Sequence, residues 1–204
     1  MTMVIGLTGG VGCGKSTVLE LMEQHFNCRG IRTDEVAREQ MKRGGAVYTR
    51  VLEEFGSAAD GGLTGTDGEI DRAKLAALVF SDAERLARLN GLTHPAVTEY
   101  VLGEVERERK SGRYDYLVVE TALLIEGGYG SFCDEIWYVA APEEERRARL
   151  KRSRGYSEQK IGELFARQQS EEAFLSVATA VIDNRDGRSE KDILEQLTEI
   201  LRKL

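Results

Sequence analysis

The chain has 204 residues, of which 41% are hydrophobic and 31% are charged, and its formal net charge at pH 7 is −7. This length suits one domain with insertions, and it is sufficient to bury a substantial hydrophobic core. The negative net charge argues against a general nucleic-acid-binding surface, which is normally basic, so any affinity for phosphate groups must come from local positive sites.

The sequence shows no sign of membrane insertion or export. It has no run of about 18 apolar residues, and its first residues lack the basic segment and long apolar stretch of a leader. The three cysteines, Cys13, Cys28 and Cys133, are odd in number and include no C-x-x-C pair, so neither a disulfide framework nor a zinc site is indicated. We therefore expect a cytoplasmic protein with no membrane contact, no nucleic-acid partner and no obligate protein partner.

Residues 9–16 carry the most informative motif of the chain. They read Gly-Gly-Val-Gly-Cys-Gly-Lys-Ser and match the pattern G-x-x-x-x-G-K-[ST] of a phosphate-binding loop. An apolar run over residues 3–8 precedes the motif, and apolar residues recur at helical spacing over residues 18–26. The alternative is a glycine-rich turn with an accidental Lys-Ser, and the order of strand, loop and helix argues against it.

The chemistry of phosphate binding explains the residue types in this loop. Glycine allows the positive φ angles and close approach with which backbone N–H groups surround a phosphate, and we expect this at Gly10, Gly12 and Gly14. Lys15 would bring positive charge to the β- and γ-phosphates, while the hydroxyl of Ser16 would bind Mg²⁺. The predicted nucleotide-binding residues are Gly10, Val11, Gly12, Cys13, Gly14, Lys15, Ser16 and Thr17.

Cys13 has two interpretations. The N-terminus of the following helix could lower its pKa and make the thiol reactive. Alternatively, it is a small side chain at a motif position that carries no fixed chemistry, and we favour this second interpretation.

Asp34 is the first candidate outside the loop. Residues 27–30 indicate a turn, and residues 31–33 a short strand that ends at Asp34. Because ligands of open α/β sheets gather at the carboxyl ends of strands, Asp34 would face the same crevice as the phosphate loop and could act as a base. It could also be the N-cap of a helix over residues 35–42, and the two roles are compatible.

The chain from residue 35 to about residue 110 has a helical pattern without a convincing strand. Three segments have apolar residues at i, i+3 and i+4 spacing, with Ser81 or Asp82 as the cap of the third, and a loop rich in glycine and aspartate joins the first two. Pro95 is suited to the first turn of a further helix that reaches about Arg109. The predicted segments are helices at 47–55, 72–80 and 82–92, with the loop at 57–68.

The predicted sheet resumes after this helical insertion. Residues 116–120 form an apolar run suited to a strand that is buried on both faces, and residues 136–139 and 180–184 indicate two more strands. Glu120 and Glu126 are the acidic residues nearest a strand end in this region. Either could hold water bound to Mg²⁺, and an ordinary surface carboxylate is an equally good interpretation of each.

A helix that begins at Pro142 carries many arginines. Arg146, Arg149 and Arg152 recur every three residues and share one side, as expected of a lid that closes guanidinium groups over phosphates. The alternative is a solvent-exposed face paired with nearby glutamates. A second helix over residues 157–169 would complete a helical hairpin, and Ser189 would cap a closing helix that packs on the core.

Six short segments lie in a characteristic order along the chain. They are residues 5–17, residues 34–38, Ile70-Asp71-Arg72 with Leu75, Val79-Phe80-Ser81-Asp82, Leu89-Asn90 with His94-Pro95, and residues 181–184. Together they resemble dephospho-CoA kinase. The phosphate loop alone is shared by many unrelated NTPases, but the Val-Phe-Ser-Asp and Leu-Asn-x-x-x-His-Pro segments are far more specific.

The resemblance implies a reaction and its participants. The reaction is ATP-dependent phosphorylation of the ribose 3′-hydroxyl of 3′-dephospho-CoA (EC 2.7.1.24), the last step of coenzyme A biosynthesis, with ATP and Mg²⁺ as cofactors. By position, Asp34 resembles the family's acidic residue beside the acceptor hydroxyl, and Arg38 and His94 resemble its substrate-binding residues. Asn184 resembles the residue next to the nucleotide base, and Arg149 resembles the lid arginine.

The resemblance also implies the domain organisation. The expected fold is α/β, with a P-loop NTPase core containing a parallel sheet, a helical substrate-binding insertion and a helical lid. We expect the core at residues 1–34, 111–140 and 179–204, the CoA-binding insertion at 35–110 and the lid at 141–178. Lys15 and Arg149 would neutralise charge on the transferred phosphoryl group, and Asp34 would orient the acceptor hydroxyl and accept its proton.

The chain departs from the family pattern in three places. Residues 122–126 read Ala-Leu-Leu-Ile-Glu in place of Pro-Leu-Leu-Phe-Glu, and residues 178–179 read Ala-Thr in place of Ala-Asp. The Arg-Asp of the lid is replaced by Arg152-Ser153-Arg154, which leaves open whether Arg152 or Arg154 contacts phosphate.

Two other functions were weighed. One is a different small-molecule P-loop kinase, acting on a nucleoside monophosphate or a sugar acid, which would differ mainly in residues 35–110. The other is a nucleotide-dependent switch protein without enzymatic activity. A GTPase switch would be expected to carry an Asn-Lys-x-Asp motif, and the sequence has none.

Overall fold

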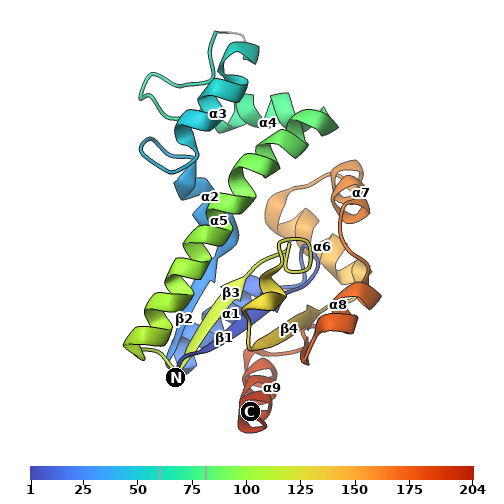
Figure 1. The fold of residues 1–204 in the computed structure, drawn as a ribbon. Helices are drawn as coiled ribbons and strands as arrows, with labels where there is room; N and C mark the ends of the chain where they lie inside the picture. Colours follow the sequence, from blue (N-terminus) through green and yellow to red (C-terminus); the bar gives the residue numbers. More distant parts are fainter. Residues whose placement is uncertain (60, 81) are drawn as a thin grey trace. The chain divides into compact units, whose positions relative to one another are not determined.

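The computed structural model describes residues 1–59, 61–80 and 82–204. These residues form an α/β fold around a five-stranded sheet with the strand order β2-β3-β1-β4-β5 (Figure 1). The strand pairs β1–β3, β1–β4 and β4–β5 are parallel. The strands are β1 (Met3–Thr8), β2 (Cys28–Arg32), β3 (Tyr116–Glu120), β4 (Glu135–Ala140) and β5 (Ala180–Asp183).

The chain divides into two compact units. The first contains Met1–Ile31 and Val105–Leu204, and the second contains Arg32–Glu104. The first unit includes nearly the whole sheet together with α1 (Lys15–His25), α6 (Glu143–Arg154), α7 (Glu158–Ala166), α8 (Glu171–Val177) and α9 (Glu190–Arg202). The second contains α2 (Thr33–Gln40), α3 (Tyr48–Phe55), α4 (Arg72–Phe80) and most of α5 (Ala83–Ser111).

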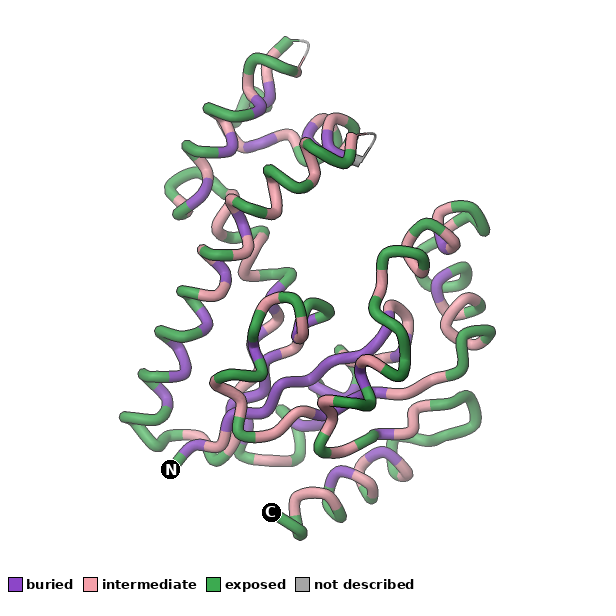
Figure 2. Tube along the Cα trace, turned by 45° about the vertical axis from the view of Figure 1, so that its right-hand side comes forward, coloured by how far each residue is buried: buried purple, intermediate pink, exposed green. Residues whose placement is uncertain are grey.

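The sheet is the buried centre of the first unit. Its middle strands lie in the buried part of the tube in Figure 2, and the whole Leu117–Val119 segment of β3 is inaccessible to solvent. Residues of α1 and α9 share one hydrophobic cluster with residues of the strands, including Val18, Trp137 and Leu197. Apolar burial of this extent provides the main stabilisation of the sheet, and it fixes the carboxyl ends of β1 and β3, where the site lies.

The second unit has a hydrophobic cluster of its own. It joins α3, α4 and the segment between them through Val47, Val51, Phe55, Leu63, Ile70, Leu75 and Val79. An isolated antiparallel bridge pairs Thr64 with Ile70, and no strand lies within residues 33–59, 61–80 and 82–104. The helical character expected for this part of the chain is confirmed.

The expected helices at 82–92 and after Pro95 are one continuous helix, α5, so the prediction of two helices was wrong. Pro95 removes one backbone hydrogen bond inside the helix, at a cost of about 3 kcal/mol. Burial of Val97, Val101 and Val105 on one side of the later turns offsets this cost, at about 1.5–3 kcal/mol for each side chain. The helix is capped by Asp82, whose carboxylate accepts the backbone N–H groups of residues 84 and 85; the alternative cap, Ser81, lies outside the described residues.

The second strand also differs from the sequence prediction. Residues 28–30 were expected in a turn, and they form the first part of β2. A Cβ added at Gly30 would lie 2.9 Å from Leu19 Cδ1 and 2.7 Å from Glu23 Oε1, so this glycine allows α1 to approach the strand. A glycine of close approach inside a strand was therefore misread as a turn residue.

Asp34 is not a helix cap. Helix α2 begins at Thr33, with Arg32 in the extended N-cap position and no capping bond from a side chain, so the cap expected at Asp34 was wrong. Asp34 lies in the first turn of α2, where a negative charge interacts favourably with the helix dipole.

The helix expected over residues 157–169 ends at Ala166, and a separate helix, α8, follows. The hydroxyl of Ser170 accepts the backbone N–H of Ala173 and so caps α8. The ring of Phe174 is buried and stacks on Tyr138, with centroids 5.4 Å apart. Seven residues are too few for a clear helical period, so the sequence pattern did not separate α7 from α8.

Two other predictions concern the C-terminal region and the membrane. The cap of the closing helix is confirmed, because Ser189 and Asp192 form a reciprocal capping box at the start of α9. Across residues 1–59, 61–80 and 82–204, the helices are all too short or too polar to span a bilayer.

Candidate functional site

The phosphate-loop segment lies between β1, which ends at Thr8, and α1, which begins at Lys15. The positive φ angles are at Gly9 (+150°), Gly12 (+81°) and Gly14 (+95°). Gly10 has no positive φ angle, so of the two properties expected of the loop glycines it shows only the close approach. The turn that brings the loop into α1 is made at Gly14, the N-cap of the helix.

Close packing gives a second reason, besides the φ angles, why three loop positions need glycine. A Cβ added at Gly10 would come within 3.0 Å of the guanidinium of Arg146, and one added at Gly14 would come within 3.0 Å of Asn184 Nδ2. One added at Gly12 would lie 2.9 Å from the carbonyl oxygen of Arg146. Helix α6 and the segment after β5 therefore pack directly on the loop, and any larger residue at these positions would push them away.

Lys15 and Ser16 are held at the start of α1. The ammonium of Lys15 donates to the carbonyl oxygens of Gly9, at 2.8 Å, and Gly10, at 3.4 Å. The hydroxyl of Ser16 donates to Glu120 Oε1, at 2.8 Å, from the exposed first turn of α1. A charged amine, a hydroxyl and a carboxylate are thus placed around one helix N-terminus, which itself favours anions.

The structure distinguishes the two glutamates that the sequence left open. Glu120 is the last residue of β3 and bonds to Ser16, so it belongs to the phosphate-loop site. Glu126 accepts a hydrogen bond from Gln169 Nε2, at 2.9 Å, in the segment between β3 and β4. Oxygen atoms of Ser16 and Glu120 are the hard ligands that a small divalent cation prefers. Within the described residues no group of three or more His, Cys, Asp or Glu side chains could hold a metal alone.

Arg149 and Asn184 meet the loop from two directions. Asn184 Nδ2 donates to the carbonyl oxygen of Cys13, at 2.8 Å, and Arg149 Nη1 reaches the same oxygen at 3.4 Å. Arg149 also donates to the carbonyl oxygen of Asn184 and to Asp186 Oδ1, both at 2.7 Å, and it pairs with Glu145. The guanidinium of Arg149 therefore ties α6 to the loop and to the segment after β5.

The other arginines of α6 have different surroundings. Arg147 pairs with Glu143 and Glu158, as expected of a solvent-exposed face. Arg152 and Arg154 are both exposed, and Arg154 lies over the ring of Tyr156.

Cys13 is 1% exposed and belongs to the main hydrophobic cluster. This burial favours its interpretation as a small packing residue. The thiols of Cys28 and Cys133 are also protected, because burial raises the pKa of each to about 12.

The residues expected to bind the acceptor lie in the second unit. Asp34 and Arg38 are exposed and are one turn apart on α2, so they share a face of that helix. His94 is half-buried within α5, directly before Pro95.

Sequence reasoning missed two parts of the loop's surroundings. Gln168 Oε1 accepts the backbone N–H of Val11, at 3.2 Å, and a single glutamine carries no motif that could have predicted this. The spacing of Arg146 placed it on the predicted phosphate-facing side of its helix, but it did not show that the side chain would lie beside Gly10 while Arg152 is exposed.

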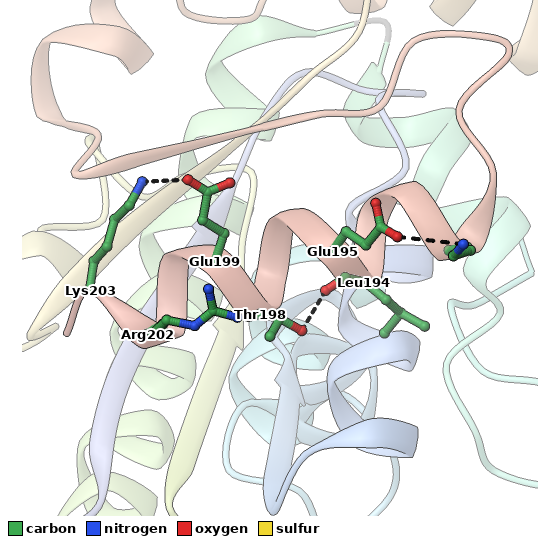
Figure 3. A pocket seen from close by; sticks show the side chains of 7 residues that line it. Leu194, Glu195, Thr198, Glu199, Arg202 and Lys203 are labelled. Carbon is green, nitrogen blue, oxygen red and sulfur yellow. Dashed lines mark hydrogen bonds and ion pairs between the residues drawn. The ribbon is translucent and has the colours of Figure 1, made fainter.

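A hollow on the surface of α9 lies away from this site. It has a volume of about 550 Å³ and is lined by Lys191, Leu194, Glu195, Thr198, Glu199, Arg202 and Lys203. Figure 3 shows the ion pair between Lys203 and Glu199 on this helix. Lys191 and Glu195 form a second ion pair. All of the lining residues come from one exposed helix, so we interpret the hollow as a solvated face.

Comparison with known proteins adds to this geometry. The family described as dephospho-CoA kinase matches residues 3–190. The dephospho-CoA kinase of Carboxydothermus hydrogenoformans is 36% identical over 200 residues, which cover 98% of this chain and 93% of the relative.

Two solved structures are similar to the whole chain. One from Thermus thermophilus has a TM-score of 0.80 and 30% identity, and covers 100% of this chain and 98% of its own. The dephospho-CoA kinase from Campylobacter jejuni has a TM-score of 0.71 at 22% identity, with 100% and 97% coverage, and supports the fold alone.

These matches decide between the functions weighed from the sequence. They do not favour a kinase with a nucleoside monophosphate or sugar-acid acceptor, and they confirm the P-loop kinase fold. The family uses ATP, typically with a divalent metal ion. The chain belongs to the dephospho-CoA kinase family, which phosphorylates dephospho-CoA with ATP in coenzyme A biosynthesis.

Proposed function

We propose that this chain transfers the γ-phosphoryl group of ATP to the ribose 3′-hydroxyl of 3′-dephospho-CoA through the site around Lys15, Ser16 and Glu120. The observation that carries the proposal is the hydrogen bond between Ser16 and Glu120, which joins the phosphate loop to the end of β3. Phosphoryl transfer requires mainly alignment and charge neutralisation, so a rigid loop with fixed donors suits this reaction.

Mg²⁺ is the metal that fits these residues. It binds through one or two carboxylates, hydroxyl groups and substrate phosphates, and it keeps several water ligands. Ser16 and Glu120 would hold it, and Mg²⁺ would supply positive charge to the phosphate oxygens. The protein's own part is to orient the two oxygen atoms, which the 2.8 Å bond between them already does.

In this proposal Lys15 neutralises charge on the β- and γ-phosphates. Its ammonium is already directed to the inside of the loop by the carbonyl oxygens of Gly9 and Gly10. Residues 10–17 surround the phosphates with their backbone N–H groups, apart from those of Val11 and Cys13, which are bonded within the protein. Asn184 borders the nucleotide from the segment after β5. The contact between Asn184 and Cys13 supports this role, since it fixes the amide against the loop.

Asp34 acts on the acceptor in the proposed mechanism. It accepts the proton of the 3′-hydroxyl and orients the attacking oxygen, which contributes about 10²–10⁴-fold to the rate. Arg38 and His94 bind the acceptor. The exposure of Asp34 and Arg38 on one face of α2 supports these roles, because both side chains are accessible to a ligand.

The domain roles follow from the same proposal. Residues 35–110 bind the CoA moiety, residues 141–178 form the lid, and residues 1–34, 111–140 and 179–204 form the nucleotide-binding core. Arg149 is the lid residue that we place in catalysis, through its contact with the loop at Cys13. A cytoplasmic location is part of the proposal and rests on the biosynthetic role of the family.

An acceptor panel tests the proposed function. Purified protein with ATP and Mg²⁺ is assayed for ADP release with 3′-dephospho-CoA, AMP, CMP, shikimate and gluconate. We expect turnover with 3′-dephospho-CoA and only background ADP release with the others. Selective turnover of any other acceptor would overturn the proposal.

A further inference from the structure

Arg146 borders the phosphate loop with both its backbone and its side chain. Its carbonyl oxygen lies 2.9 Å from a Cβ added at Gly12, and its guanidinium carbon lies 3.0 Å from one added at Gly10. The next turn of α6 anchors this part of the helix through Leu150, which is 1% exposed. The guanidinium is therefore fixed beside the first turn of the loop.

An aromatic side chain supports the guanidinium in this place. Its carbon lies 4.5 Å from the centroid of the Phe165 ring of α7. Burial and the charge of Glu171 raise the pKa of Tyr138 in β4 to about 12, and the positive charge of Arg146 acts against them. An aromatic face supports a cation but does not neutralise it.

The ion pairing of Arg146 differs from that of its neighbours on α6. Arg147 pairs with two glutamates, and Arg149 pairs with Asp186 and Glu145. Across residues 1–59, 61–80 and 82–204, no carboxylate forms an ion pair with Arg146, although the residue is half-buried. A partly buried cation without a counter-charge is unfavourable, and an anion at the loop would remove this cost.

Gln168 supports the same corner of the loop. Its Oε1 accepts the N–H of Val11 and lies 3.1 Å from a Cβ added at Gly10, so it shares the surroundings of Arg146. The bond fixes the loop backbone next to the guanidinium. A planar guanidinium that is held in this way suits phosphate oxygens, which it can bind through two parallel N–H groups.

We propose that Arg146 contacts the polyphosphate of the bound nucleotide, with Gln168 as the positioning residue for the loop beside it. In this arrangement Arg146 adds to the positive charge that Lys15 and Arg149 bring to the β- and γ-phosphates. The inference rests on the proposed function for the identity of the nucleotide, ATP.

The test compares two neighbouring arginines that lie over the same ring. Arg146→Gln and Arg147→Gln each remove one charge next to Phe165, but only Arg146 borders the loop. The dissociation constants of ATP and AMP are measured by calorimetry for the full chain, with the melting temperature of each variant. AMP lacks the β- and γ-phosphates, so it reports on the nucleotide site without the contact that we propose.

We expect Arg146→Gln to weaken ATP binding about tenfold or more, as for loss of a charge-assisted hydrogen bond, and to leave AMP binding unchanged. Arg147→Gln should bind both nucleotides like the wild type. Equal ATP affinity in Arg146→Gln and wild type, or a parallel loss for AMP, would overturn the inference.

A second variant tests the inference if Arg146→Gln does not fold. Arg146→Lys keeps the charge but has no planar pair of donors, so we expect weaker ATP binding with unchanged AMP binding. ATP affinity equal to that of the wild type would then overturn the inference. If the wild type binds ATP but does not phosphorylate 3′-dephospho-CoA, the proposed function fails and the inference about Arg146 is judged separately on binding.

Discussion

The two units of the chain hold their candidate side chains in different ways. In the first unit, Lys15, Ser16 and Asn184 are each hydrogen-bonded to the phosphate loop or to the strand beside it. In the second unit, Asp34 and Arg38 extend from an exposed face of α2. The first arrangement is held by hydrogen bonds within the protein, whereas the second consists of exposed side chains.

This difference predicts different consequences of mutation. Preorganised donors reduce the cost of binding and stabilise charge without rearrangement, so changes in the first unit should alter nucleotide affinity, stability or both. An exposed carboxylate that acts only on the acceptor should alter kcat and leave nucleotide affinity unchanged. The predictions below test this division, beginning with the largest expected effect.

Asp34→Asn should show the pattern of the second unit most clearly. The amide keeps the size of the side chain but cannot accept the hydroxyl proton, so kcat should fall about 10²–10⁴-fold. ATP affinity and the melting temperature should stay at wild-type values, because Asp34 is exposed and does not cap α2. The matched control is Glu35→Gln, which removes a charge from the adjacent exposed position. Wild-type turnover in Asp34→Asn would leave the proposed mechanism without its base.

Lys15→Ala should reduce kcat/KM about 10²–10³-fold, because one preorganised charge at the phosphates is lost. ATP binding should weaken in the same variant, unlike in Asp34→Asn. Lys151→Ala is the control, since Lys151 is a surface lysine that pairs with Glu158. Steady-state kinetics and calorimetry check both effects, and a near-normal kcat/KM in Lys15→Ala would refute the phosphate role of this loop.

The ion pair between Arg29 and Glu108 should stabilise the first unit in a pH-dependent way. Burial by itself would raise the pKa of Glu108, but hydrogen bonds from Arg29, at 2.5 Å, and Ser111 hold it below its usual range. The lowered pKa adds stability above about pH 4.5, and this contribution is lost as the pH falls through the pKa of the folded state.

Arg29→Met should therefore lower the free energy of unfolding by about 2 kcal/mol at pH 7, because it leaves a buried carboxylate without its main partner. The difference from the wild type should shrink in acid. Arg88→Met breaks two exposed ion pairs in the second unit and should have no measurable effect. Urea denaturation at pH 7 and pH 4 checks these results, and a constant difference between the two pH values would contradict this account of the pair.

Two glycine substitutions should change the stability of the protein in opposite directions, and by less than Arg29→Met. Gly12→Ala places a Cβ at a φ of +81° and 2.9 Å from a backbone oxygen of α6, so it should destabilise the protein by about 1–2 kcal/mol. Gly91→Ala lies within α5, where an added Cβ meets no atom within 4 Å, and should stabilise it by about 0.5–1 kcal/mol. Thermal unfolding measures both, and a stabilising Gly12→Ala would contradict the packing of α6 on the loop.

Local pattern was sufficient to predict the strand, loop and helix around residues 3–26, because the motif and its buried flanks agree with each other. It failed where one residue type serves two purposes. Gly30 was read as a turn glycine but allows a close approach, and Pro95 was read as a helix start but lies inside α5. In both places tertiary packing outweighed the local preference.

The candidate site shows the same limit. Lys15 and Ser16 are part of a motif, so their place at the start of α1 could be predicted. The pairing of Glu120 with Ser16, and the contact of Gln168 with Val11, join residues more than 100 positions apart. Such contacts depend on strand order and helix packing, which a single sequence does not reveal.

The most direct measurement of the central claim is the identity of the phosphorylated product. The purified protein is incubated with ATP, Mg²⁺ and either 3′-dephospho-CoA or an analogue with hydrogen in place of the 3′-hydroxyl, and the products are analysed by mass spectrometry. Our account predicts that 3′-dephospho-CoA gains one phosphoryl group for each ADP released and that the analogue gains none. Phosphorylation of the analogue, or ADP release without a phosphorylated CoA product, would contradict it.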